Sequence, residues 1–183
     1  MATIFAHGLA ATTLCYCAHK DPPKWVLTRS MIYCSIIPDL DVFGFGFGIS
    51  YGEFWGHRGF THSIVFAALI GSAVAMVLKL RLGLSNQKTS FWAFLLFLAT
   101  VSHPFLDALT NGGLGVAAFS PFDDSRYFFP WRFLEVSPIG GAFISYRGLV
   151  VLVNETIFIG IPCLALLLGR FFLARVRNSK QTQ

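Results

Sequence analysis

Three long apolar stretches constrain the fold of this chain more than any other feature. They cover residues 62–80, 91–110 and 148–173. Each is close to the roughly 20 residues that an α-helix needs to cross the hydrocarbon core of a bilayer. Because lipid offers no hydrogen-bond partner to the backbone, such stretches cross a membrane as helices. The sequence therefore predicts an all-α, polytopic helical membrane protein.

Two shorter apolar segments precede the long ones. Residues 4–18 and 26–37 are short for an upright span, so we expect them to be tilted, half-inserted or packed against the long helices. The prediction is then about four to five membrane segments. No linker rich in proline or serine divides the chain. We expect one integral-membrane domain over residues 1–174, followed by a basic cytoplasmic tail at residues 175–183.

The composition argues against a soluble domain and against a nucleic-acid partner. The chain is 55% hydrophobic and only 13% charged, whereas soluble domains carry about 25% charged residues. Its net charge of +5 is not gathered into an arginine-rich stripe, so we expect membrane lipids and no nucleic acid as partners. The four cysteines all lie inside apolar stretches, which argues against a disulfide framework.

The basic residues predict the orientation of the helices. Ten of the fourteen lysines and arginines fall on one side of the predicted bundle, and the positive-inside rule makes that side cytoplasmic. We therefore expect the N-terminus outside and the C-terminus in the cytoplasm. The ten residues are Lys20, Lys24, Arg29, Lys79, Arg81, Lys88, Arg170, Arg175, Arg177 and Lys180.

The same topology gathers the histidines and several acids at the outer face. Its centre is the polar segment His57-Arg-Gly-Phe-Thr-His62-Ser63, set in an otherwise apolar chain. Polar groups without partners are costly at membrane depth, and ionisable residues there are usually functional. The convergence predicts a metal site at the outer, periplasmic face. The predicted metal ligands are His7, Asp39, Asp41, His57, His62, His103 and Asp107.

Residue spacing adds detail to this prediction. His103 and Asp107 are four residues apart, so on a helix they share one face and can converge on one ion. We expect Pro104 to mark a break in the helix just before this turn. Asp39 and Asp41 are two residues apart, and the sequence leaves open which of them binds the metal directly.

The polar segment and the stretch before it predict local structure. We expect His57 in a loop and His62 in the first turn of the following helix, with Thr61 as its cap. Residues 42–49 alternate phenylalanine with glycine, a pattern too flexible for a helix. They predict either a loop that dips into the outer leaflet and admits a lipid tail, or an aromatic belt at the interface.

The residue types indicate the chemistry. Imidazole and carboxylate ligands suit zinc, and also manganese or iron. One or two such ions lower the pKa of a bound water and clamp an ester or phosphoester oxygen, which predicts hydrolysis. Arg58 lies beside the ligands and suits an anionic substrate group, since guanidinium matches phosphate. Asp39 and Glu155 are the candidate carboxylates for general acid–base catalysis.

Several motifs together resemble a known family, the YdjM/YbcI family of inner-membrane, metal-dependent hydrolases. The motifs are HRGFTHS at 57–63, PDLD at 38–41, HPFLDALTNGG at 103–113, and FPWRFLEVSPIGGAFISYRG at 129–148 followed by Glu155. The likeness covers the chain from His7 to about Pro162, and it implies a bacterial plasma membrane and a metal cofactor. The ligand pattern is also remotely similar to that of zinc-dependent phospholipase C, an all-helical fold with a His-x-x-x-Asp pair like His103 and Asp107.

Alternatives remain open for single residues. His7 either binds the metal or packs near the interface, and Glu155 either binds the metal or pairs with Arg147. The whole set is either a metal site or a structural polar network.

For the function, we expect a hydrolase of a lipid or lipid-linked substrate. The alternatives are a non-catalytic membrane protein with a structural metal site and a metal-ion carrier or sensor. A structural zinc site is closed by four ligands, whereas this chain offers six or seven. A carrier needs a polar route across the membrane, and the inner halves of the long segments offer almost none. The hydrolase is therefore favoured, and the oligomeric state is left open.

Overall fold

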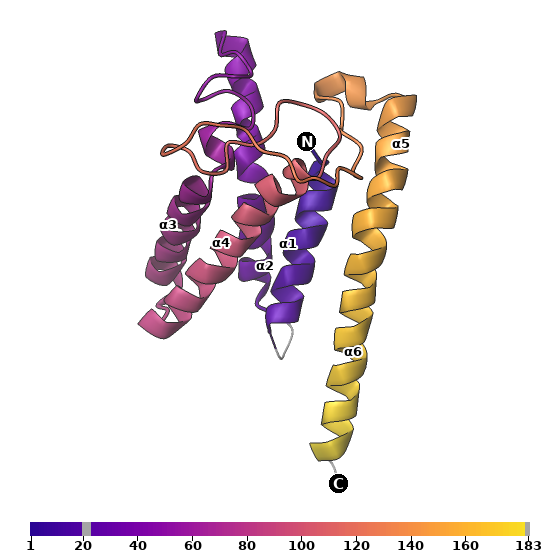
Figure 1. The fold of residues 1–183 in the computed structure, drawn as a ribbon. Helices are drawn as coiled ribbons and strands as arrows, with labels where there is room; N and C mark the ends of the chain where they lie inside the picture. Colours follow the sequence, from indigo (N-terminus) through magenta and orange to yellow (C-terminus); the bar gives the residue numbers. More distant parts are fainter. Residues whose placement is uncertain (20–22, 182–183) are drawn as a thin grey trace.

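The protein is an all-helical bundle. The computed structural model describes residues 1–19 and 23–181, with side chains through Arg175. Within this range every element is helical apart from two isolated β-bridges, so the all-α prediction is confirmed. The α-helices, labelled in Figure 1, are α1 (Ile4–Ala18), α2 (Trp25–Ile36), α3 (Ile64–Leu82), α4 (Asn86–Ala108), α5 (Tyr146–Glu155) and α6 (Ile161–Gln181). Shorter elements are the 3₁₀ helices η1 (Ile37–Phe47), η2 (Phe60–His62) and η3 (Gly140–Phe143), and the π-helix Thr156–Gly160.

Four helical stretches are long and apolar enough to cross a membrane. They are Trp25–Phe47, Ile64–Leu82, Asn86–Ala108 and Tyr146–Arg175. Helix α1 is apolar but shorter, with 15 residues. These elements confirm the prediction of four to five membrane segments. The last helix extends beyond its predicted limits, because the backbone stays helical through Gln181 and so into the predicted tail.

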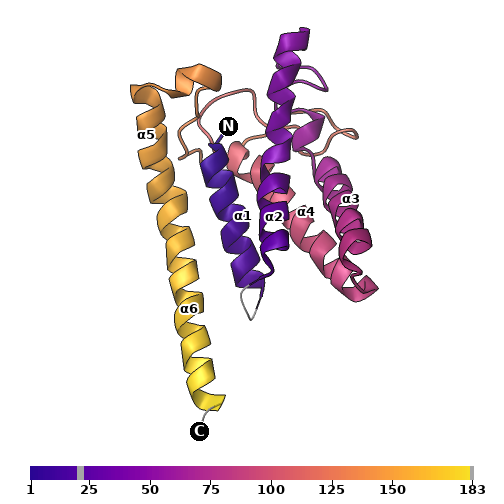
Figure 2. The ribbon, with the colours of Figure 1, turned by 180° about the vertical axis from the view of Figure 1, so that it is seen from behind.

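The helices run up and down between two ends of the bundle. The N-terminus lies at one end and the C-terminus at the opposite end (Figure 1). Helix α4 packs against α1, α2 and α3, whereas the rod formed by α5 and α6 packs mainly against α1, as the view from behind shows (Figure 2). The connection between α4 and α5 folds over the end that holds the N-terminus. This end is hereafter called the N-terminal end.

An apolar core fills the bundle between the two ends. Its large side chains are Leu27, Met31, Trp92, Leu95 and Leu96, each at most 6% exposed. They come from α2 and α4, and Leu78 of α3 with small residues of α1 and α3 completes the cluster. This packing leaves the interior of the bundle closed below the N-terminal end.

The second membrane segment differs from its prediction. Helix α2 continues directly into the 3₁₀ helix η1, and Gly48 ends it in a left-handed conformation with φ of 80°. Residues 42–47 are therefore helical, so the first alternative, a loop, is wrong, and the aromatic belt at the interface stays a prediction. Pro38 lies where α2 passes into η1, and it has no backbone N–H to donate at this junction. A 3₁₀ helix of this length is uncommon, which explains why the pattern did not indicate one.

Helix α3 begins later than expected. The hydroxyl of Ser63 accepts a hydrogen bond from Phe66 N at 3.0 Å and caps the helix. His62 therefore lies in η2, before the helix, and the prediction of Thr61 as the cap was wrong. Thr61 instead donates its hydroxyl to Asp41 Oδ2 at 2.7 Å.

Pro104 does not break α4, contrary to the prediction. The helix runs without interruption from Asn86 to Ala108 with Pro104 inside it. Proline removes one backbone hydrogen bond and disfavours a helix interior. Here α4 is held by packing against three other helices, so tertiary contacts override the local preference. His103 and Asp107 consequently share one continuous helical face.

A glycine at the contact of α3 with α4 gives a test of this packing. A Cβ atom on Gly71 would lie 2.7 Å from Phe97 N and 3.0 Å from Phe97 Cα. We expect Gly71→Ala to lower the free energy of unfolding by about 1–3 kcal/mol, because the helices must separate. Thermal unfolding in detergent measures the change. The matched control is Gly169→Ala, where a Cβ would meet nothing within 4 Å; equal midpoints for the two variants would contradict the close approach.

Candidate metal centre

One cluster at the N-terminal end contains every predicted metal ligand. The residues come from α1, from η1, from the loop and 3₁₀ turn before α3, and from the last turns of α4. Each is at most 8% exposed, so water does not solvate them. In chain order they are His7, Asp39, Asp41, His57, His62, His103 and Asp107.

Four of these residues form a first group. Asp39, His62, His103 and Asp107 offer ligand atoms that all lie within 4.8 Å of one another. Nε2 of His103 is 3.3 Å from Asp39 Oδ1, and Nε2 of His62 is 3.6 Å from Asp107 Oδ2. The two Nε2 atoms are 3.1 Å apart. Two nitrogens and two oxygens therefore face a common point.

Hydrogen bonds on the far side of each ring orient the two imidazoles. Nδ1 of His103 lies 2.7 Å from the carbonyl oxygen of Ser35. Because a carbonyl only accepts, Nδ1 carries the proton and the Nε2 lone pair faces the first group. Nδ1 of His62 lies 3.1 Å from Asp41 Oδ2. Such partners behind the ring are typical of histidines that bind metals.

The electrostatics of the first group favour positive charge. Burial by itself lowers the pKa of a histidine, but hydrogen bonds to Asp107, Asp39 and Asp41 raise the pKa of His62 to about 10. The surrounding carboxylates thus stabilise a cation at this position.

Asp41 belongs to a second group with His57 and His62. Its Oδ1 lies 2.7 Å from His57 Nδ1, and its Oδ2 accepts from Thr61 Oγ1 and from the backbone N of Arg58 at 3.1 Å. Both oxygens of Asp41 are therefore held by protein donors. Asp41 therefore lies behind His62 and orients its ring, with His57 beside it. Asp39 is itself a member of the first group, and its carboxylate faces the other members.

His7 lies at the edge of the first group. Its ring stacks on that of His103, with centroids 3.7 Å apart, and its Nε2 is 3.7 Å from Asp107 Oδ1. Neither ring nitrogen has a hydrogen-bond partner in the described part of the chain. This arrangement makes His7 a fifth candidate ligand.

Unpartnered atoms test whether the cluster fits a metal. Among the described residues, both oxygens of Asp39 are buried without a hydrogen bond, and Oδ2 of Asp107 has an ion pair with Arg58 Nε at 3.0 Å but no hydrogen bond. Buried polar atoms are almost always partnered, and these three oxygens all belong to the first group, with the two unpartnered nitrogens of His7 at its edge. The donor set of imidazole nitrogen and carboxylate oxygen therefore fits a divalent cation.

Arg58 does not lie as the sequence suggested. Its side chain is fully buried, with Nε 3.0 Å from Asp107 Oδ2. The two terminal nitrogens donate to Gly112 O and Thr110 Oγ1, each at 3.0 Å. All three nitrogens are thus directed at protein groups, and the contact with an anionic substrate that the sequence suggested stays a prediction. The connection after α4 folds back onto Arg58, which spacing along the chain does not reveal, and Arg58 fixes Asp107.

Glu155 lies outside both groups. It accepts hydrogen bonds from the backbone N of Thr3 at 2.6 Å and from the Thr3 hydroxyl. Arg147 pairs with Glu135 instead, so neither of the two alternatives for Glu155 holds. Eight residues of helix separate Glu155 from Arg147 by about 12 Å, and Glu135 of the connection lies nearer. Glu155 fastens α5 to the start of α1.

Arg126 and Ser35 support the cluster but were missed from the sequence. Arg126 is half-buried and donates to the carbonyls of His57 at 2.9 Å and Tyr51 at 3.0 Å. It thereby anchors the segment that carries His57. Ser35 acts through its backbone carbonyl, which no residue pattern marks. Arg126 follows two acids in the sequence, and this local pattern does not indicate its contacts with Tyr51 and His57.

The comparison with known proteins decides the family. A family model described as YdjM inner membrane protein matches residues 1–178. The chain belongs to this family. This YdjM-family chain is 34% identical to inner membrane protein YbcI of Escherichia coli (strain K12), over 96% of this chain and 99% of the relative. No solved structure matches it.

Membership in the YdjM family confirms the resemblance that the motifs carried. Together with the four spans, it makes the chain a multi-pass protein of the inner membrane. The buried histidine and aspartate groups are able to hold a metal ion.

Metal content tests the first group. We expect purified protein to hold one or two equivalents of a divalent metal, and His62→Ala, His103→Ala and Asp107→Ala to lose it, since each removes a donor atom. Elemental analysis by plasma mass spectrometry measures the content. The control is His19→Ala at the C-terminal end of α1, which should keep the metal; folded wild type without metal would contradict the site.

The two aspartates of η1 are expected to differ. Asp39→Asn should abolish metal retention, because Asp39 faces the first group. Asp41→Asn should weaken metal affinity by about 10–100-fold, because it removes the partner behind His62. Competition with a chelator of known affinity gives both numbers. The reverse order of effects would show that the assignments of Asp39 and Asp41 are exchanged.

Proposed function

We propose that this protein is a membrane-embedded, metal-dependent hydrolase that cleaves an ester or phosphoester bond of a lipid or lipid-linked substrate. The observation that carries the proposal is the first group: two imidazoles and two carboxylates face one point, with His7 beside them. Zinc suits these donors best, and manganese or iron also match. A catalytic site needs a ligand position open to water or substrate.

The residues of the chain divide the work in this proposal. His62, His103, Asp39 and Asp107 would hold the ion, and when bound it would supply a Lewis acid and lower the pKa of a coordinated water to about 7. Arg58 holds Asp107, while Ser35 and Asp41 orient the two histidines. Asp39 offers a second oxygen that is able to accept a proton. Arg58 and Glu155, named as catalytic candidates from the sequence, serve as supports.

An opening beside the cluster supports a lipid substrate. A pocket of about 360 Å³ lies between η1 and the start of α3. Its polar groups are Asp41 and Thr61, and its walls include Leu40, Trp55 and Phe66. Both bordering elements belong to predicted spans, so a molecule with an apolar tail can approach from the membrane. The site would lie at the periplasmic face, with the N-terminus outside, if the basic residues orient the helices as the positive-inside rule predicts.

The other functions find less support. A carrier needs a polar route to the opposite end, but Leu27, Met31 and Leu96 of the apolar core are fully buried below the cluster. A structural zinc site is closed by four ligands, and here His7 lies beside the first group, with Nε2 3.7 Å from Asp107 Oδ1.

Hydrolysis of defined lipids tests the proposal. Protein in nanodiscs, loaded with zinc or manganese, is incubated with a panel of phospholipids, lysophospholipids and lipid-linked phosphates, and mass spectrometry detects released products. We expect turnover of at least one class, abolished by a chelator and restored by the metal. His103→Ala and Asp39→Asn should lose at least about 100-fold, the lower range for removing a group that acts in the transition state, and His19→Ala should lose nothing. Metal-loaded wild type without turnover, or undiminished activity in His103→Ala, would refute the hydrolase.

A further inference from the structure

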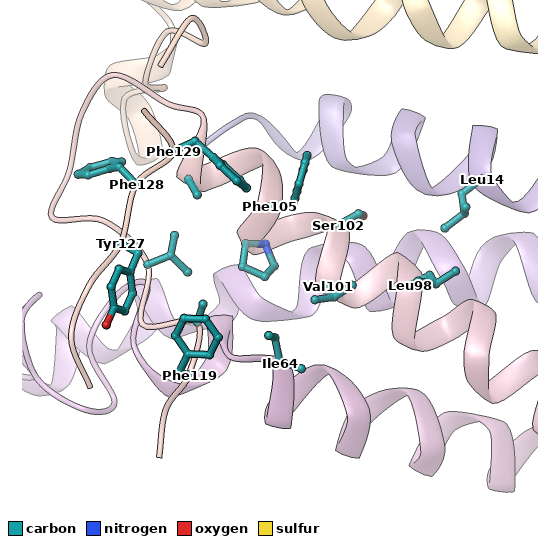
Figure 3. Close-up of a pocket in the computed structure, with 14 residues that line it drawn as sticks. Leu14, Ile64, Leu98, Val101, Ser102, Phe105, Phe119, Tyr127, Phe128 and Phe129 are labelled. Atoms are coloured by element: carbon teal, nitrogen blue, oxygen red, sulfur yellow. The ribbon is translucent and has the colours of Figure 1, made fainter. Parts of the chain in front are cut away.

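A second hollow of the molecule lies apart from the metal centre. It is an apolar groove of about 550 Å³ along α4, beneath the connection that follows that helix (Figure 3). Its lining is hydrophobic and aromatic apart from the hydroxyls of Ser102 and Tyr127. The volume falls in the range of small-molecule sites, about 300–1,000 Å³. Main lining residues are Ile64, Leu98, Val101, Phe105, Phe119 and Phe129.

Helix α4 separates the groove from the cluster. Leu98, Val101 and Phe105 follow one another at three- and four-residue spacing, so they share one helical face and line the groove. His103 and Asp107 share a different face, which points into the bundle. An occupant of the groove therefore does not reach the first group, and the two sites are distinct.

Aromatic pairs and backbone hydrogen bonds build the end of the groove. Phe105 packs against Phe129 with ring centroids 5.0 Å apart, and Phe119 packs against Tyr127 at 5.5 Å. Figure 3 shows these pairs on opposite sides of the hollow. Ile64 N donates to the carbonyl of Ala118 at 3.0 Å, which fixes the connection to the start of α3. The hollow is thus held open by the fold.

The shape and setting of the groove fit an acyl chain. From Leu98 to Phe105 it follows α4 for about 10 Å, at 1.5 Å per residue. Both α3 and α4 are predicted to span the membrane, and Phe105 and Phe119 are 55% and 52% exposed. An elongated apolar hollow along the exposed side of a membrane span contacts the hydrocarbon chains of lipids before any other ligand.

A cation lies at the rim beside the aromatic end. The guanidinium of Arg132 lies over the ring of Phe128, 4.8 Å from its centroid, and Phe128 lines the groove. Among the side chains that the structure describes, Arg132 has no carboxylate partner. The three acids on this connection have other partners. Asp123 accepts from Tyr127 on the other side of the groove, Asp124 accepts from Ser120, and Glu135 pairs with Arg147. Arginine suits phosphate in particular.

We propose that the groove binds one acyl chain of a membrane glycerophospholipid, whose phosphate pairs with Arg132. This phospholipid site is independent of the metal centre and of the hydrolase activity proposed above. The lipid would be a resident of the fold, held between α4 and the connection, and would not be a substrate.

Native mass spectrometry tests the site. Protein extracted in detergent, stripped of loose lipid and mixed with dioleoyl phosphatidylglycerol, should retain one lipid adduct. Ala118→Trp and Leu98→Trp fill opposite ends of the groove and should abolish the adduct. Arg132→Ala should weaken it about 5-fold, the effect of removing one basic residue that meets an anionic lipid.

Two variants outside the groove serve as controls. Phe94→Trp lies on an exposed part of α4, and Arg81→Ala removes a cation from the last turn of α3; both should keep the adduct. Unchanged thermal midpoints and metal content show that the groove variants are folded. The proposal would be overturned if wild type formed no adduct, or if Ala118→Trp and Leu98→Trp kept as much adduct as wild type. Loss of the adduct in Phe94→Trp to the same extent as in the groove variants would also overturn it. These outcomes do not depend on the result of the hydrolase assay.

Discussion

The structure depends above all on the burial of ionisable side chains in a bundle that a membrane surrounds. Water cannot solvate these groups, so each must find a partner inside the protein. Asp41 accepts hydrogen bonds at both of its oxygens, and Arg58 lies against Asp107, Thr110 and Gly112. Asp39, His103 and Asp107 instead face one another, an arrangement that positive charge between them stabilises. The mutual arrangement of these buried groups therefore organises this end of the bundle, and it is able to hold a metal ion.

Helix α4 connects the two sites of the molecule. One of its faces carries His103 and Asp107, and another lines the apolar groove. The connection that follows the helix touches both, because Thr110 and Gly112 bind Arg58 while the carbonyl of Ala118 binds the start of α3. An uninterrupted helix is needed for this arrangement, and the packing around Pro104 maintains it. The polar and apolar sites thus share one support while remaining on separate sides of it.

The ligand positions show how far sequence reasoning extends. Lengths of apolar segments, with the distribution of basic residues, placed His7, Asp39, His62, His103 and Asp107 at one end before any contact was known. That inference works because a membrane permits few backbone arrangements. It failed where the outcome depended on long-range contacts: Arg58 faces Asp107, Thr110 and Gly112, and Glu155 faces Thr3.

The sequence by itself determined the all-helical class, the membrane segments, the family and the types of ligand atom. The class, the segments and the atom types follow from local hydrophobicity and residue chemistry, and the family follows from the resemblance of motifs. None of these needs knowledge of neighbours in space. The tertiary structure alone decided that Asp39 faces the first group while Asp41 stands behind His62, that η1 is helical and that α4 is unbroken. Each of those outcomes depends on which of several competing contacts, between residues far apart in the chain, has the lower free energy. Packing and hydrogen bonding in three dimensions settle such competitions, and local propensity does not.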